Sequence, residues 1–252
     1  MAKIVVFDSG LGSISIIKEI KKIMKTDIVY FADQKNYPYG NKSQAQIASI
    51  IKKTINMLEE KFTPDVIVVA SNTPSLMLNL QTGKIIDVKP PLKLAQKKSK
   101  SKKIGILATK ASVNSKGLEN YVKENNIPKS YKIFKINGSN LVDLVESGKF
   151  LNNKKYCKKI IKKSLDDYII TEKIDVITLS STHLLFLKTL LEKEFPQVEF
   201  IDPGSLVAKK IFLKIKNKQS KRNSLKIFTS GNIITVSYTH LRAHETREEL
   251  GF

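Results

Sequence analysis

The sequence predicts an α/β protein made of two similar domains with mainly parallel sheets. Short apolar runs typical of strands alternate with helical patterns along the chain, and this alternation favours parallel strands joined by right-handed crossovers. The runs are almost continuously apolar, which indicates that both faces of each sheet are covered. Similar runs also recur in the two halves of the chain in the same order.

In the first half, strand-like runs occupy residues 3–7, 27–33, 65–71 and 84–88, and helical patterns follow the first three. A lysine-rich segment, KKSKSKK, then separates the halves and is a candidate linker. The second half restarts the pattern with four further runs, at residues 103–109, 131–137, 175–181 and 198–204.

The internal repeat predicts how the two halves are placed. KIVVFDS is similar to KIGILAT, and PDVIVVASNT at 64–73 is similar to IDVITLSSTH at 174–183. The second pair ends in small hydroxyl residues at the carboxyl tips of the strands, where open α/β sheets hold ligands. We therefore expect two domains related by a pseudo-twofold axis, with an active site in the cleft between them. The predicted domains are residues 1–95 plus 206–235, and residues 96–205.

Composition indicates a globular protein outside the membrane. The hydrophobic fraction is 41%, no run approaches the ~20 apolar residues of a membrane span, and the first residues lack the order of a signal peptide. A cytoplasmic location is the expectation. The single cysteine, Cys157, excludes an internal disulfide and a cysteine-based metal site. Its lysine-rich helical pattern predicts an inert thiol on a solvated helix.

The formal net charge of +21 raises nucleic acid as a partner. Lysine supplies nearly all of this charge, whereas base-edge and bidentate phosphate recognition favour arginine. The arginines are Arg222, Arg242 and Arg247 only. A basic nucleic-acid-binding protein therefore stays as an alternative, and non-specific association at low salt is expected.

Residues 236–252 differ in composition from the rest of the chain. This segment holds two of the three histidines and two of the three arginines, and it resembles translated sequencing-adapter DNA. We predict a non-native tail and exclude it from the argument. His240 and His244 are therefore not taken as metal ligands despite their helical spacing, and no metal site is predicted.

The first strand leads into Asp8-Ser9-Gly10-Leu11-Gly12, where backbone N–H groups could meet an anion at a helix N-terminus. A dinucleotide fingerprint would need a third glycine at the position of Ser15, and no phosphate-binding GxxxxGK[ST] motif occurs. A nucleotide cofactor is therefore not expected. Asp8 fits a helix N-cap as well as it fits a catalytic carboxylate.

Three further segments carry polar side chains. The turn from Tyr37 to Ser43 fits a surface turn in which Ser43 caps the next helix. Ser71-Asn72-Thr73 and Ser181-Thr182-His183 follow buried strands, and His183 is the one histidine outside the tail. Because His183 lies at the carboxyl tip of a predicted parallel strand, we expect it to be a functional residue. A Ser–His hydrolase is conceivable, although no GxSxG motif surrounds either serine.

Several motifs together resemble the glutamate racemase branch of the aspartate/glutamate racemase family. FDSGLGSISIIKEI is similar to FDSGxGGLxVxxxI, YFADQKNYPYGNKS to YFxDxxxxPYGxKS, and VVASNTPS to ACNTAS. GILATKASVNSKGLENY, LVESG, LSSTHLLFL, FIDPG and FTSGN resemble the motifs that follow, in order, to about residue 232.

The resemblance implies isomerisation of glutamate by two-base proton transfer without a cofactor, for peptidoglycan precursor supply. It implies a small anionic amino acid as ligand and a homodimer. Two cysteines act in the family, and Ser71 and Ser181 stand in their places. Ser112 stands where the family usually has threonine. The remaining matches are Asp8, His183 and Glu146 as residues that support the acid–base groups, and Ser9, Tyr39, Gly40, Asn72, Thr73, Thr109 and Thr182 as substrate-holding residues.

The two serines bear directly on activity. A serine hydroxyl is much less acidic than a thiol and acts as a base only when another group removes its proton. His183 could do so for Ser181, whereas Ser71 has no obvious partner beyond Asp8. A positioned acid or base contributes about 10²–10⁴-fold. A catalytically inactive homologue that binds glutamate or a related dicarboxylate is therefore the main alternative.

Overall fold

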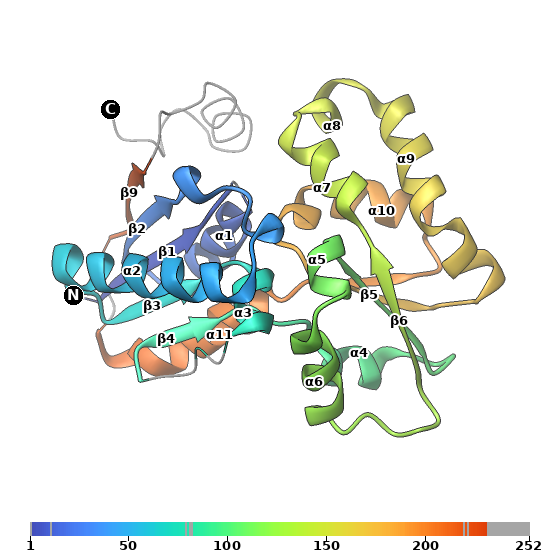
Figure 1. Ribbon diagram of the computed structural model, residues 1–252, viewed down its shortest axis with the longest axis horizontal. Coiled ribbons are helices and arrows are strands. Elements are labelled where there is room, and N and C mark those ends of the chain that lie inside the picture. The colour runs from blue at the N-terminus through green and yellow to red at the C-terminus, as the bar shows by residue number, and fades with distance from the viewer. Residues whose placement is uncertain are drawn as a thin grey trace.

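The computed structural model describes residues 2–10, 12–78, 80, 83–218, 220 and 222–230, and the predicted tail at 236–252 lies outside these ranges. Two parallel sheets lie side by side, each covered by helices on both faces (Figure 1). This arrangement confirms the predicted α/β class with two mainly parallel sheets.

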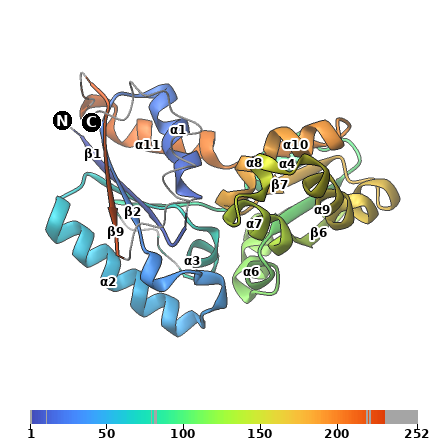
Figure 2. The ribbon, with the colours of Figure 1, turned by 90° about the horizontal axis from the view of Figure 1, so that it is seen from above.

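The first sheet has five strands in the order β4-β3-β1-β2-β9, and all neighbours are parallel. Helices α1 and α11 cover one face and α2 covers the other (Figure 2). The strands are β1 (Lys3–Asp8), β2 (Asp27–Ala32), β3 (Val66–Val69), β4 (Ile85–Asp87) and β9 (Ser224–Thr229). The helices are α1 (Ser13–Ile23), α2 (Gln44–Phe62), α3 (Asn72–Met77) and α11 (Gly204–Ile215).

The second sheet has four parallel strands in the order β6-β5-β7-β8. Its strands are β5 (Lys103–Ala108), β6 (Lys132–Asn137), β7 (Val176–Leu179) and β8 (Glu199–Ile201). Its helices are α4 (Leu92–Lys98), α5 (Lys110–Val113), α6 (Lys116–Glu124), α7 (Ser139–Glu146), α8 (Lys149–Asn152), α9 (Lys154–Asp166) and α10 (Lys188–Glu194). Short 3-10 turns span Gln34–Asn36, Tyr39–Asn41, Thr182–Leu187 and Lys216–Lys218, and a π-turn spans Asp167–Thr171.

The apolar runs form strands because alternate side chains supply two separate cores. In β1, Ile4 and Val6 pack with α1 and α11, whereas Val5 and Phe7 pack with α2. All four side chains are fully buried. Helix α2 starts at the predicted cap: the Ser43 hydroxyl accepts from the backbone N–H of Gln46, whose side chain accepts from the backbone N–H of Ser43.

The lysine-rich segment predicted as a linker is the end of α4 followed by a tight turn. Asp175, just before β7, accepts hydrogen bonds from the Ser99 hydroxyl, from the backbone N–H groups of Lys100 and Ser101, and from the Ser101 hydroxyl, at 2.7–2.8 Å. A carboxylate that accepts several N–H and O–H groups fixes a loop strongly. The charged residues of this turn therefore point outward while its backbone is anchored.

The domain boundaries predicted from the sequence stay a prediction. Strand β9 joins the first sheet, and helix α4 spans the predicted boundary at 95/96 and packs on β7. The solvated position predicted for Cys157 is wrong, because its side chain is fully buried in the core of the second sheet and only its lysine neighbours face solvent. Burial raises the pKa of its thiol.

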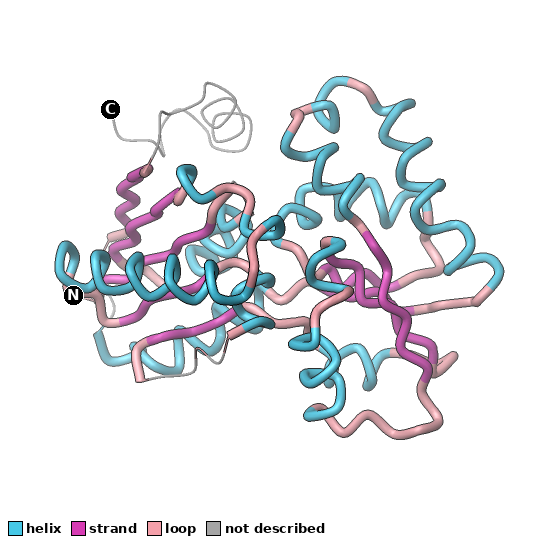
Figure 3. The backbone as a smooth tube through the Cα atoms, viewed as in Figure 1, coloured by secondary structure: helices cyan, strands magenta, loops and turns pink. Residues whose placement is uncertain are grey.

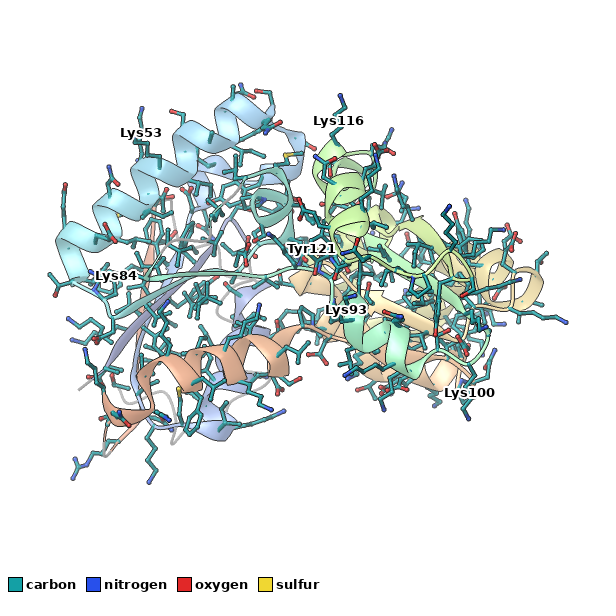
Figure 4. The ribbon with its side chains drawn as sticks, turned by 90° about the horizontal axis from the view of Figure 1, so that it is seen from below. Lys53, Lys84, Lys93, Lys100, Lys116 and Tyr121 are labelled. Carbon is teal, nitrogen blue, oxygen red and sulfur yellow. The ribbon has the colours of Figure 1, made fainter. Side chains whose placement is uncertain are left out.

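Lysines are spread over the surface of both halves. Lys53, Lys84, Lys100 and Lys116 project outward from different elements (Figure 4). Within the described ranges, every helix is too short or too polar to span a bilayer.

Candidate active site between the two sheets

The loops that follow the strands lie between the two sheets (Figure 3), and a small cavity of about 60 Å³ opens among them. In parallel sheets these loops are the usual place of ligand sites. Residues from both sheets line the cavity, which confirms that the strand tips of the internal repeat face each other. The lining residues are Asp8, Ser9, Tyr37, Pro38, Tyr39, Gly40, Ser71, Asn72, Thr73, Thr109, Ser112, Val142, Ser180, Ser181, Thr182 and His183.

One wall carries a line of three polar side chains. Ser181 follows β7, and its hydroxyl lies 3.5 Å from Nδ1 of His183 in the turn that follows. On the other side of the ring, Nε2 contacts Oε1 of Glu146 at the end of α7. Burial lowers the pKa of His183, but Glu146 and Asp8 outweigh this effect and the net shift is upward. Glu146 thus makes the imidazole a stronger base.

The opposite wall carries Asp8 at the end of β1. Its side chain is 2% exposed, and its carboxylate accepts from the backbone N–H of Ser9 at 2.7 Å and from the Thr182 hydroxyl at 3.1 Å. Burial raises the pKa of Asp8 to about 6, although the charge of His183 and the hydrogen bonds from Ser9, Thr182 and Ser71 oppose the rise. Asp8 is therefore mostly ionised at neutral pH, with a protonated fraction of about a tenth. It is not the cap of helix α1, which begins after Gly12.

Neutral donors fill the space between these walls. Asn72 is 4% exposed, and neither its amide nitrogen nor its carbonyl oxygen has a hydrogen-bond partner among the described residues. Buried polar groups are normally satisfied, so both atoms are available to a ligand. The Thr73 hydroxyl lies 3.2 Å from the Ser112 hydroxyl, which also accepts from Thr109 at 3.0 Å. This chain of hydroxyls joins the two halves.

The turn from Tyr37 to Ser43 is only partly a surface turn. Tyr37 is 40% exposed, as that interpretation requires, but Tyr39 is 2% exposed and its hydroxyl donates to the Asp33 carboxylate at 2.9 Å. Asp33 also accepts from the side-chain amide of Asn36. The buried carboxylate thus holds the loop so that Tyr39 and Gly40 line the cavity.

The glycines after β1 allow the two halves to meet. A Cβ atom on Gly12 would overlap the Thr182 hydroxyl and lie 2.6 Å from the Thr182 Cβ. A Cβ on Gly10 would lie 2.8 Å from Oε1 of Glu146 and 3.0 Å from Nε2 of His183. Glycine at these positions is explained by close approach of the second half, whereas the sequence suggested an anion-binding helix start.

Every residue that the sequence singled out for the site lies on the cavity, except Glu146, which contacts His183 from behind. Tyr37, Pro38, Val142 and Ser180 also line the cavity and were missed. Ser180 follows the buried strand directly, so its position at the strand tip is a signal that could have found it. Val142 lies on α7, and nothing local in its sequence marks it.

No group of three metal-ligating side chains gathers anywhere in the part of the chain that the structure describes. The cavity instead brings a carboxylate and an imidazole, each beside a serine, to two sides of one small space. Two parallel sheets face each other across this space, so the site combines ionisable groups from both halves of the chain.

Comparisons with known proteins identify the family. The glutamate racemase of Leptospira borgpetersenii serovar Hardjo-bovis is 30% identical over 231 residues, 88% of this chain and 86% of that protein. The glutamate racemase of Aquifex pyrophilus is 32% identical over 233 residues, 90% of this chain and 87% of that protein. The chain therefore belongs to the glutamate racemase family. No protein-family model matches it.

Solved structures agree in fold. A glutamate racemase isoform from Bacillus anthracis superposes with a TM-score of 0.81 at 25% identity, covering 95% of this chain and 92% of that one. The Aquifex pyrophilus enzyme has a TM-score of 0.70 at 28% identity, with 94% and 92% covered. The Francisella tularensis enzyme in complex with D-glutamate has a TM-score of 0.80, with 98% and 95% covered, and at 23% identity it supports the fold alone.

Proposed function

We propose that this chain binds glutamate in the cavity between the sheets and interconverts its L and D forms, which supplies D-glutamate for peptidoglycan precursors. The observation that carries the proposal is the pair of acid–base couples on the cavity. Ser71 lies beside Asp8 on the first sheet, and Ser181 lies beside His183 on the second.

Racemisation requires one group to remove the α-proton from one face of the substrate and another to deliver a proton to the opposite face. Groups with a pKa near the working pH do this best. Asp8, with a pKa of about 6, and His183, with its raised pKa, meet this requirement. Ser71 and Ser181 line the same cavity beside these groups, so each hydroxyl would pass a proton while its partner holds the charge.

Glutamate fits the donors that line the cavity. Among the described residues neither lysine nor arginine lines it, so neutral N–H and O–H groups would hold the two carboxylates, including the Asn72 amide, which has no partner in the same ranges. The net charge of +21 attracts an anionic substrate to the surface. Relatives of the same fold were solved with D-glutamate and with L-glutamate bound. The proposal also includes a cytoplasmic location and a homodimer, and light scattering after size exclusion tests the latter.

One observation favours a second candidate, a glutamate-binding protein without turnover. The lone cysteine of the chain, Cys157, is buried in the second core and does not line the cavity. Without a thiol, the two acid–base groups that the family resemblance implies are missing. The shape and polarity of the cavity would then retain ligand binding while proton transfer is lost.

Exchange of the α-proton for solvent deuterium separates these candidates. L- and D-glutamate are followed by NMR in D₂O with the wild-type protein and with Ser71→Cys/Ser181→Cys. Exchange by the wild type supports the proposal. Exchange by the double variant alone means that the wild-type protein has the scaffold of a racemase but lacks its acid–base groups. Absence of exchange in both, with glutamate binding by calorimetry, supports the binding protein.

A further inference from the structure

Ser181, His183 and Glu146 form a continuous line from the cavity into the second half. The Ser181 hydroxyl lies 3.5 Å from Nδ1 of His183, and Nε2 of the same ring contacts the Glu146 carboxylate. Ser181 is 6% exposed and His183 is 8% exposed, so bulk water does not compete strongly for these contacts. A serine, a histidine and a carboxylate therefore lie within contact distance of one another in that order.

This order of side chains is that of an activated serine nucleophile, which proton exchange at an α-carbon does not require. A serine becomes a nucleophile when an adjacent base takes its proton and a third group orients that base. Here Nδ1 faces the serine and Nε2 faces the carboxylate. Either ring nitrogen of a histidine can accept a proton while the other donates to a carboxylate. Ser181 is thus the nucleophile, His183 the base and Glu146 the group that orients the base.

We infer that Ser181 is a nucleophile that hydrolyses esters of glutamate-sized acids in the same cavity. This activity goes beyond the proposed isomerisation. It needs neither Ser71 as a second acid–base group nor a proton on the opposite face of the substrate.

The reaction balances with water as the co-reactant. The Ser181 Oγ attacks the ester carbonyl carbon, its proton passes to Nδ1 of His183, and the C–O bond to the alcohol breaks as the alcohol takes that proton. The product is an acyl-serine and a free alcohol. A water molecule then attacks the acyl carbon and gives a proton to the same nitrogen. His183 passes this proton to Oγ as the bond between Oγ and the acyl carbon breaks and the acid leaves.

The cavity supports this chemistry at two further points. The Asn72 amide is buried, lines the same cavity and lacks a partner among the described residues, so its N–H group is a donor for the developing oxyanion. The cavity is also small, about 60 Å³, which favours a short acyl group.

The other serine lacks this arrangement. Ser71 neighbours Asp8, whose carboxylate is a weaker base than the imidazole beside Ser181. Among the described residues no histidine other than His183 lies on the cavity. Modification by a serine-directed reagent should therefore be confined to Ser181.

Methanesulfonyl fluoride tests the inference because it is small and reacts much faster with an activated serine hydroxyl than with an ordinary one. Oγ forms a bond to sulfur, the S–F bond breaks, fluoride leaves and the proton passes to His183. Intact mass and peptide mapping should show one adduct, at Ser181, and saturating glutamate should slow its formation. His183→Gln should lower the labelling rate at least ~100-fold, as expected for loss of a general base. Ser205→Ala, which removes an exposed hydroxyl on α11, should change nothing.

An adduct absent from Ser181, one equally fast at Ser71, or one that forms as fast in His183→Gln would overturn the inference. Circular dichroism and thermal unfolding report whether each variant is folded. If His183→Gln is not folded, His183→Asn replaces it in the labelling experiment. Hydrolysis of glutamate γ-methyl ester, followed by methanol release, is the second readout, and it should be lost in Ser181→Ala. Because α-proton exchange is measured separately, a protein that exchanges without labelling retains the proposed function and loses this inference.

Discussion

Replacing Gly12 by alanine tests whether the two halves meet as the structure shows. The added Cβ would overlap the Thr182 hydroxyl, and it would lie 2.6 Å from the Thr182 Cβ and 3.0 Å from its carbonyl carbon. Rotation of the hydroxyl relieves only the first of these contacts. The backbone of the Thr182 turn or of helix α1 must therefore shift.

Two costs lower the free energy of unfolding of Gly12→Ala. Overpacking of a close contact costs about 1–3 kcal/mol. The Thr182 hydroxyl also donates to the Asp8 carboxylate at 3.1 Å, and a lost hydrogen bond to a charged group costs roughly 1.5–3 kcal/mol. The alanine restricts the unfolded chain and returns about 0.4–1 kcal/mol. The expected net destabilisation is about 1.5–5.5 kcal/mol.

Urea unfolding of Gly12→Ala beside Gly83→Ala measures this change. A Cβ on Gly83 meets nothing within 4 Å, so that variant should stay within about 0.5 kcal/mol of the wild type. Thr182→Ala in the Gly12→Ala background removes the nearest atom and should recover about 1 kcal/mol relative to additivity. If Gly12→Ala matches Gly83→Ala in stability and in glutamate affinity, the close approach of the halves is refuted.

Three further predictions concern charge. Asp8 has a pKa of about 6 when folded against 3.8 ordinarily, so the folded state binds more protons and the stability should fall by roughly 2–3 kcal/mol as pH rises from 4 to 6. Asp8→Asn should remove this slope in urea titrations, and an unchanged slope would contradict the assignment. Glu146→Gln should lower the pKa of His183, read from the NMR titration of its ring protons, because the Glu146 carboxylate raises it. An unchanged titration would mean that the contact is absent in solution. Asp175→Ala removes four hydrogen bonds to the turn after α4 and should destabilise the fold by about 2–3 kcal/mol in thermal unfolding. Asp27→Ala, which removes a carboxylate that accepts one side-chain bond, should cost less.

The apolar pattern was enough to predict the described strands except β9, whose side chains are half-buried or exposed. Runs such as residues 3–7 and 65–71 have both faces buried, and a run of that length bounded by polar residues has few other conformations in a folded protein. The hydroxyl residues at the strand tips were predictable for the same reason, since the direction of a parallel strand determines where its last residues point.

Contacts between distant segments were decided only by the tertiary structure. The Asp8–Thr182 hydrogen bond joins residues 174 positions apart. The contact between Glu146 and His183 depends on how α7 packs against the turn after β7, which no local pattern states. The sequence suggested that His183 acts on Ser181 and that Glu146 supports the acid–base groups, but it could not show that the three side chains lie in contact.

The difference between local sequence pattern and tertiary contact also explains the predictions that were wrong. Cys157 was expected at a solvated surface because lysines flank it, yet a helix has two faces and only packing reveals which one carries the thiol. Gly10 and Gly12 suggested an anion site because glycine frees the backbone, whereas here glycine leaves room for the second half. Periodicity along the chain determined which residues are buried in each sheet. The approach of the two sheets determined which polar residues share a site, because that approach depends on atoms from both halves at once.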